Sequence, residues 1–225
     1  MSEGSHWAKP AIEVVLEEEL GPEGRPEFLR LRRRRLHNRL PDGRTTASYV
    51  YDSVDRGATD AVILVLHHRG PRGREVLLRT SIRPPLAFRR ELTVPLHRQA
   101  SPVIWELPAG LVEPAEIGEE GLLACAARET LEEAGFDLAP GAFRSLGPSL
   151  FLSPGVLAER IYFYEAEVDP ATRGVPTEDG SPVEEGAAVR FFDLDEALAT
   201  GPVQDVKTEL GLRRLRERYP GEGAP

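Results

Sequence analysis

The chain has 225 residues, 40% hydrophobic and 29% charged, so it is long enough to bury a sizeable core and has the composition of a globular protein. A net charge of −9 argues against nucleic acid as a partner, because phosphate backbones are bound by clustered cations. The absence of a long apolar run and of a recognisable secretory signal predicts no membrane partner. Cys125 is the only cysteine, so no intrachain disulfide forms, and the cytoplasm is the expected location.

The first 57 residues are predicted to form a region of their own. Residues 1–27 mix Pro, Gly and Glu and indicate an irregular lead-in. Residues 28–54 indicate β-structure, with a turn at "LPDGR" (40–44). "RLRRRRL" (30–36) is interpreted as an exposed strand with solvated arginines rather than as an anion-binding patch. The main domain is predicted over 58–219 and a disordered tail over 220–225.

The main domain alternates strands and helices in a way that predicts an α/β sandwich with a mixed sheet, not a doubly wound parallel sheet. Strands are expected at 60–68, 75–82, 102–111, 158–168 and 188–194, one clear helix at 119–134, two helices after 194, and loops at 84–101 and 169–187. The strand over 102–111 ends in a bend at Pro108–Gly110, and Gly135 is expected to stop the helix.

The helix carries the first chemical signal. At about 100° per residue, one arc holds small and apolar residues (Leu123, Ala124, Ala126, Ala127, Thr130, Leu131 and Ala134), and the opposite arc holds Arg128, Glu129, Glu132 and Glu133. Such a charged arc is usually a solvated surface. Here it follows a strand that ends in a Pro-Ala-Gly bend, which lets bare backbone groups approach an ion. Convergent carboxylates at such a place favour Mg²⁺ or Mn²⁺.

The same stretch resembles the Nudix box, G-x5-E-x7-R-E-U-x-E-E-x-G-U, where U is a bulky apolar residue. The matching residues are Gly110, Glu116, Arg128, Glu129, Glu132, Glu133, Gly135 and Phe136, with Thr130 at the first U. Eleven residues, rather than seven, separate Glu116 from Arg128, so Glu116 and Glu120 both remain candidates for the first glutamate. The resemblance implies a Nudix-type α/β/α sandwich with a mixed sheet, here with an N-terminal β-extension.

The resemblance also implies the roles of the box residues. Glu129 and Glu133 would be the principal metal ligands, with Glu132 as ligand or support and the Ala109 carbonyl as a further ligand. Arg128 would orient the glutamates. The metal would stabilise the charge that develops when water attacks a phosphorus atom.

Two further stretches resemble the branch that hydrolyses ADP-ribose and other nucleoside-diphosphate sugars. These are "SPGVLAE" (153–159), with Pro154 and Gly155, and "TSIRPP" (80–85), with Arg83. Alone, they would be interpreted as a plain turn and a solvated strand end. The "PAG" bend, with Ala109 and Gly110, argues against the coenzyme A branch. The resemblance implies that Arg83, Ala109, Gly110, Pro154 and Gly155 contact the substrate, with a nucleoside monophosphate and a sugar phosphate as products.

The resembling ADP-ribose hydrolases carry the glutamate that acts as general base on a loop just before a late strand, which implies the loop 174–188 here. Glu185 is the first candidate, Glu184 the second and Glu178 the third, with Glu132 or Glu159 as the fallback. The resembling proteins pair their subunits through a β-segment such as 28–57, which predicts a homodimer. The alternative function is a non-catalytic Nudix domain that binds a nucleotide metabolite and regulates a partner.

Overall fold

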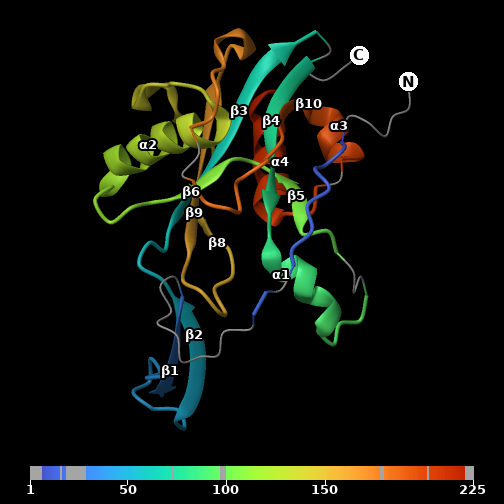
Figure 1. The fold of residues 1–225 in the computed structure, drawn as a ribbon. Coiled ribbons are helices and arrows are strands. Elements are labelled where there is room, and N and C mark those ends of the chain that lie inside the picture. The colour runs from blue at the N-terminus through green and yellow to red at the C-terminus, as the bar shows by residue number, and fades with distance from the viewer. Residues whose placement is uncertain are drawn as a thin grey trace.

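A computed structural model describes residues 7–15, 17–18, 29–71, 73–96, 100–177, 180–201 and 203–220. Its centre is an eight-stranded sheet (Figure 1), in which the main path runs in the order β10-β4-β3-β9-β7. These strands are β10 (Val189–Asp193), β4 (Gly73–Ile82), β3 (Ala61–Gly70), β9 (Arg160–Glu167) and β7 (Arg144–Ser145). β5 (Val103–Glu106), β6 (Ala109–Leu111) and β8 (Leu150–Phe151) pair with β4, β3 and β9. β3 and β9 run parallel and the other pairs antiparallel, which confirms the mixed sheet.

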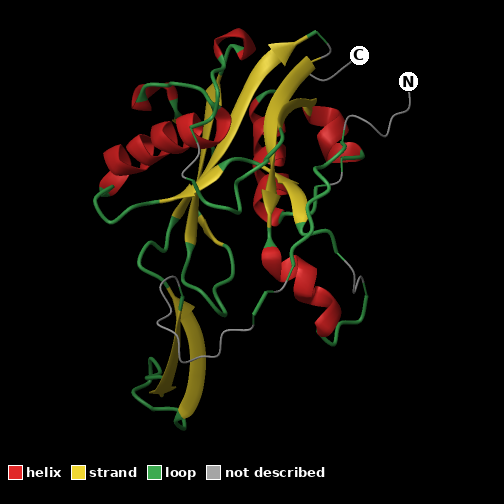
Figure 2. Cartoon of the chain, viewed as in Figure 1, coloured by secondary structure: helices red, strands yellow, loops and turns green. Residues whose placement is uncertain are grey.

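Helices cover both faces of the sheet, as Figure 2 shows. Val62 and Leu64 of β3 pack in one core with α2 (Gly118–Glu129) and its π-helical continuation η3 (Thr130–Ala134). Ile63 of β3 packs in the other core with α4 (Val206–Arg218), and α3 (Leu194–Ala199) joins the same core. Successive strand residues point to opposite faces, so one apolar run serves two cores. The α/β/α sandwich is therefore confirmed.

The predicted loop over 84–101 contains short helices. α1 (Pro84–Ala87) is followed by a 3-10 turn, η2 (Phe88–Glu91). Two of its prolines, Pro84 and Pro85, occupy the first helical positions, where a missing N–H costs little and the fixed φ suits the helix. Two further 3-10 turns are η4 (Pro140–Ala142) and η5 (Pro170–Thr172).

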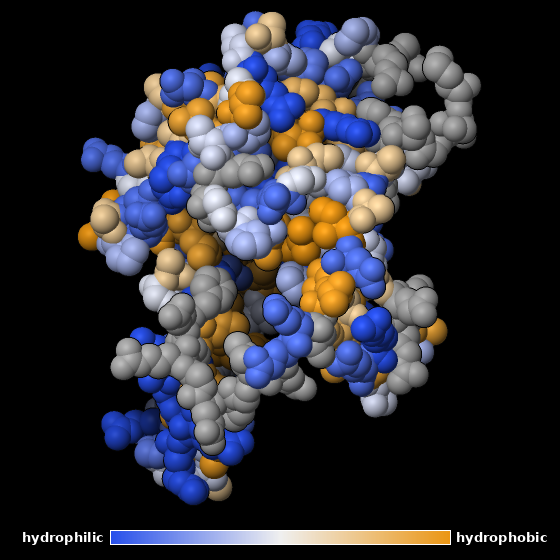
Figure 3. Space-filling view, in the orientation of Figure 1, coloured by the Kyte–Doolittle hydropathy of each residue, from blue (hydrophilic) through white to orange (hydrophobic). Residues whose placement is uncertain are grey.

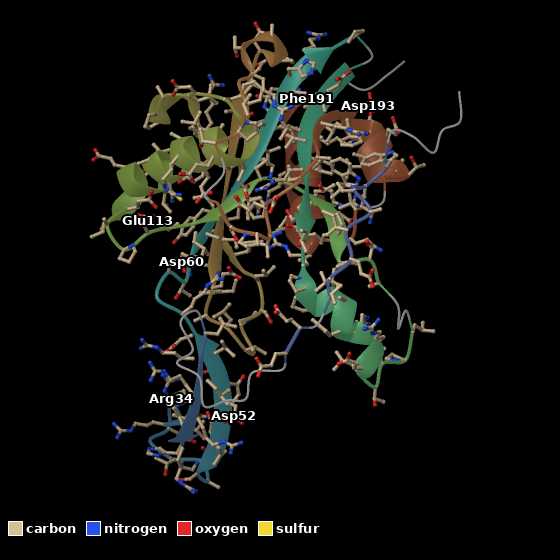
Figure 4. The ribbon with its side chains drawn as sticks, in the orientation of Figure 1. Arg34, Asp52, Asp60, Glu113, Phe191 and Asp193 are labelled. Atoms are coloured by element: carbon tan, nitrogen blue, oxygen red, sulfur yellow. The ribbon has the colours of Figure 1, made fainter. Side chains whose placement is uncertain are left out.

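The N-terminal β-extension is a separate antiparallel hairpin of β1 (Arg30–Leu36) and β2 (Tyr49–Asp55), which projects from the body (Figure 1). All seven residues of β1 are exposed, in agreement with the interpretation of its arginines as solvated. Arg33 pairs with Asp52 across the strands at 2.8 Å, and Figure 4 labels Asp52 and Arg34 there. The hairpin touches the body where the Tyr51 hydroxyl donates to the Gly155 carbonyl at 2.8 Å.

The described part of the lead-in, residues 7–15 and 17–18, has no helix or strand, as predicted, but it is anchored to the body. The Trp7 ring stacks on Phe192 with ring centres 3.9 Å apart, and its Nε1 donates to Glu196 at 3.0 Å. The Trp105 Nε1 donates to the Trp7 carbonyl at 3.1 Å. The tail lies outside the described residues from 221 onward. Within the described ranges, no helix is long and apolar enough to cross a membrane.

Candidate active site

The box helix forms at nearly the predicted residues, but its last turn differs. α2 gives way at Thr130 to a π-helical turn, which ends at Gly135 with a φ of 79°. Gly135 is required there, because that backbone conformation strains L side chains and an added Cβ would lie 2.5 Å from the Gly174 carbonyl oxygen. The predicted stop is confirmed, and the loop that follows η5 packs directly against it.

The predicted helix faces are wrong at three positions. Glu133 was expected on the solvent side and is buried, whereas Ala124 and Leu131 were expected on the core side and are exposed. The π turn explains the difference at Leu131 and Glu133, because residues in this wider turn are spaced at a smaller angle around the helix axis than in an α-helix. Glu133 therefore turns inward toward the sheet.

Arg128 supplies the positive charge that the crowded glutamates require. Its Nη1 donates to Glu129 at 2.6 Å and to Glu132 at 3.1 Å, and its Nη2 donates to the Leu111 carbonyl at 3.2 Å. One guanidinium thus ties two box glutamates to the end of β6. The orienting role expected of Arg128 agrees with these contacts.

The extra residues of the box place Glu116, not Glu120, against Arg128. Arg128 Nε lies 3.1 Å from Glu116 Oε1, whereas Glu120 stands on the first turn of α2, about 12 Å away along the axis. The loop turns tightly, because the Glu113 amide donates to Glu116 at 2.7 Å (Glu113 is labelled in Figure 4). Gly121 lets the loop lie on the helix, since a Cβ there would stand 2.2 Å from the Glu116 backbone. The insertion is absorbed before the functional turn.

Glu129 lies directly on the Pro-Ala-Gly bend. A Cβ at Gly110 would stand 1.7 Å from the Glu129 carboxyl carbon, so only glycine fits below this carboxylate. Burial raises the pKa of Glu129 to about 7; the Arg128 charge and hydrogen bond oppose the rise, and the Glu132 and Glu184 carboxylates add to it. The site therefore disfavours a negative charge at the place where the box resemblance expects a cation ligand.

Glu133 is held by two donors from the sheet. Its Oε2 accepts from the Ala109 amide at 2.7 Å, and its Oε1 pairs with Nη1 of Arg79 in β4. The same Nη1 lies 3.3 Å from Glu184 Oε1, on the loop before β10. The box helix, the bend and this loop thus meet around one buried guanidinium.

A cavity of about 550 Å³ opens beside the bend, and Ala109 and Gly110 form part of its wall. Arg83 also lines it, with its Nη2 donating to the buried Glu106 at 2.5 Å and its Nε at 3.1 Å. Figure 3 shows hydrophobic surface where this face is hollowed between β8 and α1. The other lining residues are mostly aliphatic, with a few charged groups: Arg56, Ala61, Ile63, Pro85, Leu86, Ile104, Leu111, Leu152, Glu159, Ile161, Gln204, Asp205 and Lys207.

Of the remaining predicted residues that the structure describes, only Glu159 lines the cavity. Pro154 and Gly155 are exposed and are not among the residues that line the cavity, and Gly155 instead contacts β2. Glu185 is exposed beside the more buried Glu184, and Glu178 is outside the described residues. Glu159 lines the cavity and pairs with Arg56.

Sequence reasoning missed Arg79, Glu106 and Lys207. Glu106 and Lys207 meet across the cavity, with Lys207 Nζ 3.2 Å from Glu106 Oε2. Arg79 directly follows the apolar run 76–78 of β4, and Glu106 ends the apolar run of β5, a signal that could have marked them, since buried charges are nearly always paired. Lys207 offered no such signal in its helix.

Comparison with known proteins agrees with this geometry. The family model of the NUDIX domain matches residues 58–210. The chain is 33% identical over 173 residues to the ADP-ribose pyrophosphatase of Haemophilus influenzae, covering 76% of this chain and 69% of the relative. It is 33% identical over 165 residues to the GDP-mannose pyrophosphatase of Citrobacter koseri, covering 67% and 79%. The GDP-mannose pyrophosphatase of Yersinia pestis is 29% identical over 173 residues, covering 73% and 81%. The chain therefore belongs to the Nudix family.

Proposed function

We propose that this chain is a metal-dependent pyrophosphohydrolase that cleaves ADP-ribose or another nucleoside-diphosphate sugar into a nucleoside monophosphate and a sugar phosphate. The observation that carries the proposal is the position of the box: Glu129 and Glu133 contact the bend whose other side is a cavity of about 550 Å³. A diphosphate can lie at the bend while a nucleoside or sugar enters the cavity. The relatives' names, ADP-ribose pyrophosphatase and GDP-mannose pyrophosphatase, support the substrate class.

The donor set fits a hard divalent cation in chemistry. Carboxylate oxygens of Glu129, Glu132 and Glu133 and the Ala109 carbonyl are the ligands that Mg²⁺ or Mn²⁺ prefers, and they stand at one end of the helix. The described residues contain no preformed group of three such side chains, because Arg128 and Arg79 hold these carboxylates in ion pairs. A bound cation would stabilise the charge that develops on the phosphate and make the attacking water more acidic.

Arg83 is proposed to bind the substrate. Glu106 fixes two of its guanidinium nitrogens, and the Arg83 side chain still keeps 47% of its surface exposed toward the cavity side. A guanidinium held in this way presents its remaining N–H groups in a fixed direction, which suits a phosphate or a sugar hydroxyl. Pro154 and Gly155 remain proposed substrate contacts, although in this single chain their loop faces the hairpin.

Glu184 is the better-placed general base. Its carboxylate reaches the same guanidinium as Glu133, whereas the Glu185 side chain is exposed, which reverses the order of preference expected from the sequence. Glu159 and Glu132 also form ion pairs, with Arg56 and Arg128, so pairing alone does not separate the candidates; the guanidinium that Glu184 shares with the box residue Glu133 favours Glu184. We expect Glu184→Gln to lower kcat by about 10²- to 10⁴-fold with nearly unchanged KM. Glu185→Gln is the matched control, and full turnover in both variants would move the base to another residue.

A substrate panel tests the function. Purified protein is incubated with Mg²⁺ or Mn²⁺ and ADP-ribose, GDP-mannose or other nucleoside-diphosphate sugars, and a phosphatase then releases phosphate from the monoester products. Hydrolysis of at least one of these compounds, abolished by chelation, is the expected result. Metal-dependent binding without hydrolysis of any of them would instead support a non-catalytic domain. The complete carboxylate set around Arg128 favours catalysis.

We also propose a homodimer formed through the β1–β2 hairpin. Leu31 and Val50 lie on one face of the hairpin by register and are 72% and 50% exposed. A second subunit would cover this face and bring its own groups near the 153–156 loop. A dimeric mass in light scattering at micromolar concentration is expected, and a monomeric mass would contradict the proposal. The cytoplasmic location and the absence of a nucleic-acid partner stay predictions from the sequence.

A further inference from the structure

Arg79 is a charged residue in the middle of β4, and it is only 3% exposed. A guanidinium buried to this degree is stable only where carboxylates pair with it. Arg79 lies opposite Val189 in the β4–β10 register, next to the point where the loop 174–188 enters β10. Arg79 therefore lies where the sheet meets that loop. It is not one of the residues of the Nudix box pattern.

One nitrogen of Arg79 serves two carboxylates from different elements. Nη1 pairs with Glu133 Oε1, at the end of the box helix, and lies 3.3 Å from Glu184 Oε1. Glu133 receives a second hydrogen bond, from the Ala109 amide, so its orientation is set from two sides. Arg79 thus neutralises part of the repulsion between Glu133 and Glu184, and it holds the loop glutamate over the box.

Both ends of the loop 174–188 form hydrogen bonds to residues that lie close in sequence to Arg79 and Glu133. Thr80 exchanges two hydrogen bonds of 2.8 Å with Ala188, one from each backbone N–H. At the other end, the Gly174 amide donates to the Gly135 carbonyl at 2.8 Å, and Arg173 Nε donates to the Ala134 carbonyl at 2.9 Å. Between these anchors, the ion pair of Arg79 and Glu184 connects the interior of the loop to the site.

We propose that Arg79 is a positioning residue that holds Glu184 in place for the reaction and, by its charge beside Glu133, weakens the binding of a divalent cation. The proposal rests on the function proposed above. Its two effects have opposite signs once the charge is removed. Glu184 loses its ion pair with Arg79, which slows turnover, while the surroundings of Glu129, Glu132 and Glu133 become more negative, which favours a cation. A merely structural role would weaken both properties together.

The test compares Arg79→Gln with Arg79→Lys, and uses Arg69→Gln, an exposed arginine on β3, as the charge-matched control. Mn²⁺ binding is measured by calorimetry without substrate, and kcat is measured separately. We expect Arg79→Gln to bind Mn²⁺ more tightly than the parent and to lose about 10- to 100-fold in kcat. Arg79→Lys keeps the positive charge but loses the planar guanidinium with its several N–H donors. Its Mn²⁺ affinity should therefore stay near that of the parent, and its kcat should fall less than that of Arg79→Gln. If the Gln variant does not fold, the Lys variant tests the positioning of Glu184: kcat should fall while Mn²⁺ affinity stays near that of the parent, and an unchanged kcat would overturn the proposal.

A double-mutant cycle separates positioning from other effects. If Arg79 acts through Glu184, the kcat losses of Arg79→Gln and Glu184→Gln will not add in the double variant. Additive losses, unchanged or weaker Mn²⁺ binding in Arg79→Gln, or unchanged kcat would each overturn the proposal. The calorimetric result needs no substrate, so it stands apart from a failure of every nucleotide sugar in the substrate panel.

Discussion

Two enclosed glutamates of this chain have pKa values displaced in opposite directions. Glu165, on β9, accepts hydrogen bonds from Arg218 at 2.9 Å and from the Tyr219 hydroxyl at 3.0 Å, and it lies 2.5 Å from His67 Nε2. Burial acts to raise its pKa, but these donors lower it to about 2. Glu129 has Arg128 as its donor and two carboxylates nearby, and its pKa rises to about 7. Burial has the same sign at both sites, so the neighbours decide the direction.

Glu165 is a structural carboxylate, and Glu129 is the carboxylate of the proposed metal site. The charge of Glu165 is satisfied by the protein itself, where Arg74 donates to His67 Nδ1 and leaves His67 Nε2 to donate to Glu165. The charge of Glu129 is only partly balanced, which leaves the site ready for an added cation. Substituting Glu165 or Glu129 alters one side of this contrast at a time, and substituting Glu133 or Thr130 alters the neighbours of Glu129 on the box helix.

The largest effect is expected from Glu133→Gln, with a loss in kcat of about a hundredfold or more, because a proposed metal ligand loses its charge. Because Glu133 is buried and paired with Arg79, we also expect a loss of about 1–3 kcal/mol in the free energy of unfolding. Kinetics and urea unfolding of the same preparation measure both. Near-normal turnover would remove Glu133 from the metal site.

Glu165→Gln should change stability without changing turnover. The folded-state pKa of about 2 lies below the ordinary value of 4.5, so the stabilisation is present above pH 4.5 and is lost as the pH falls through 2. At pH 7 the variant should be less stable by about 3 kcal/mol, and its unfolding free energy should vary less between pH 5 and pH 2. Glu167→Gln, an exposed neighbour on β9, is the control. A steep acid limb retained in Glu165→Gln would contradict the assignment.

Glu129→Gln should do the reverse. Its folded-state pKa of about 7 lies above 4.5, so the contribution to stability is complete below pH 4.5 and is lost as the pH rises through 7. In the presence of a chelator at pH 8, we expect the variant to be more stable than the parent by about 1–3 kcal/mol, with no difference of this sign at pH 4.5. Turnover should be lost. Lower stability of the variant at pH 8 would show that Arg128 outweighs burial.

The smallest effect is expected at Thr130, where the box pattern has an apolar residue. The Thr130 hydroxyl is fully buried and has no hydrogen-bond partner in the described structure. Thr130→Val keeps the branched shape and removes the unsatisfied group, so the unfolding free energy should rise by about 1 kcal/mol. Thr200→Val, at an exposed hydroxyl that donates to Glu196, should bring no gain. Equal changes in the two variants would mean that the Thr130 hydroxyl is satisfied.

Sequence patterns were enough to predict the long strands, the box helix and the residues of the box, whereas the segment 102–111, predicted as one strand ending in a bend, forms the two strands β5 and β6. The period of an apolar pattern follows from the local geometry of a strand or helix, so it can be read from a short stretch of sequence. The spacing of four residues between Arg128 and Glu132 likewise brings the two side chains together on any α-helix. The bend at Gly110 was readable for a similar reason, since a residue without Cβ marks a close approach. These signals lie within a few residues of one another in the chain.

Only the three-dimensional packing shows that Glu133 is buried, that Glu116 rather than Glu120 lies beside Arg128, and that Arg79 pairs with Glu133 and Glu184. Arg79 and Glu133 are 54 positions apart and Arg79 and Glu184 are 105 apart, so no spacing rule relates them. The π turn changed the direction of Glu133 in a way that a regular helix projection does not anticipate. Local periodicity specifies which residues face a core, but the packing of β4, the box helix and the loop before β10 decides which charges share one site.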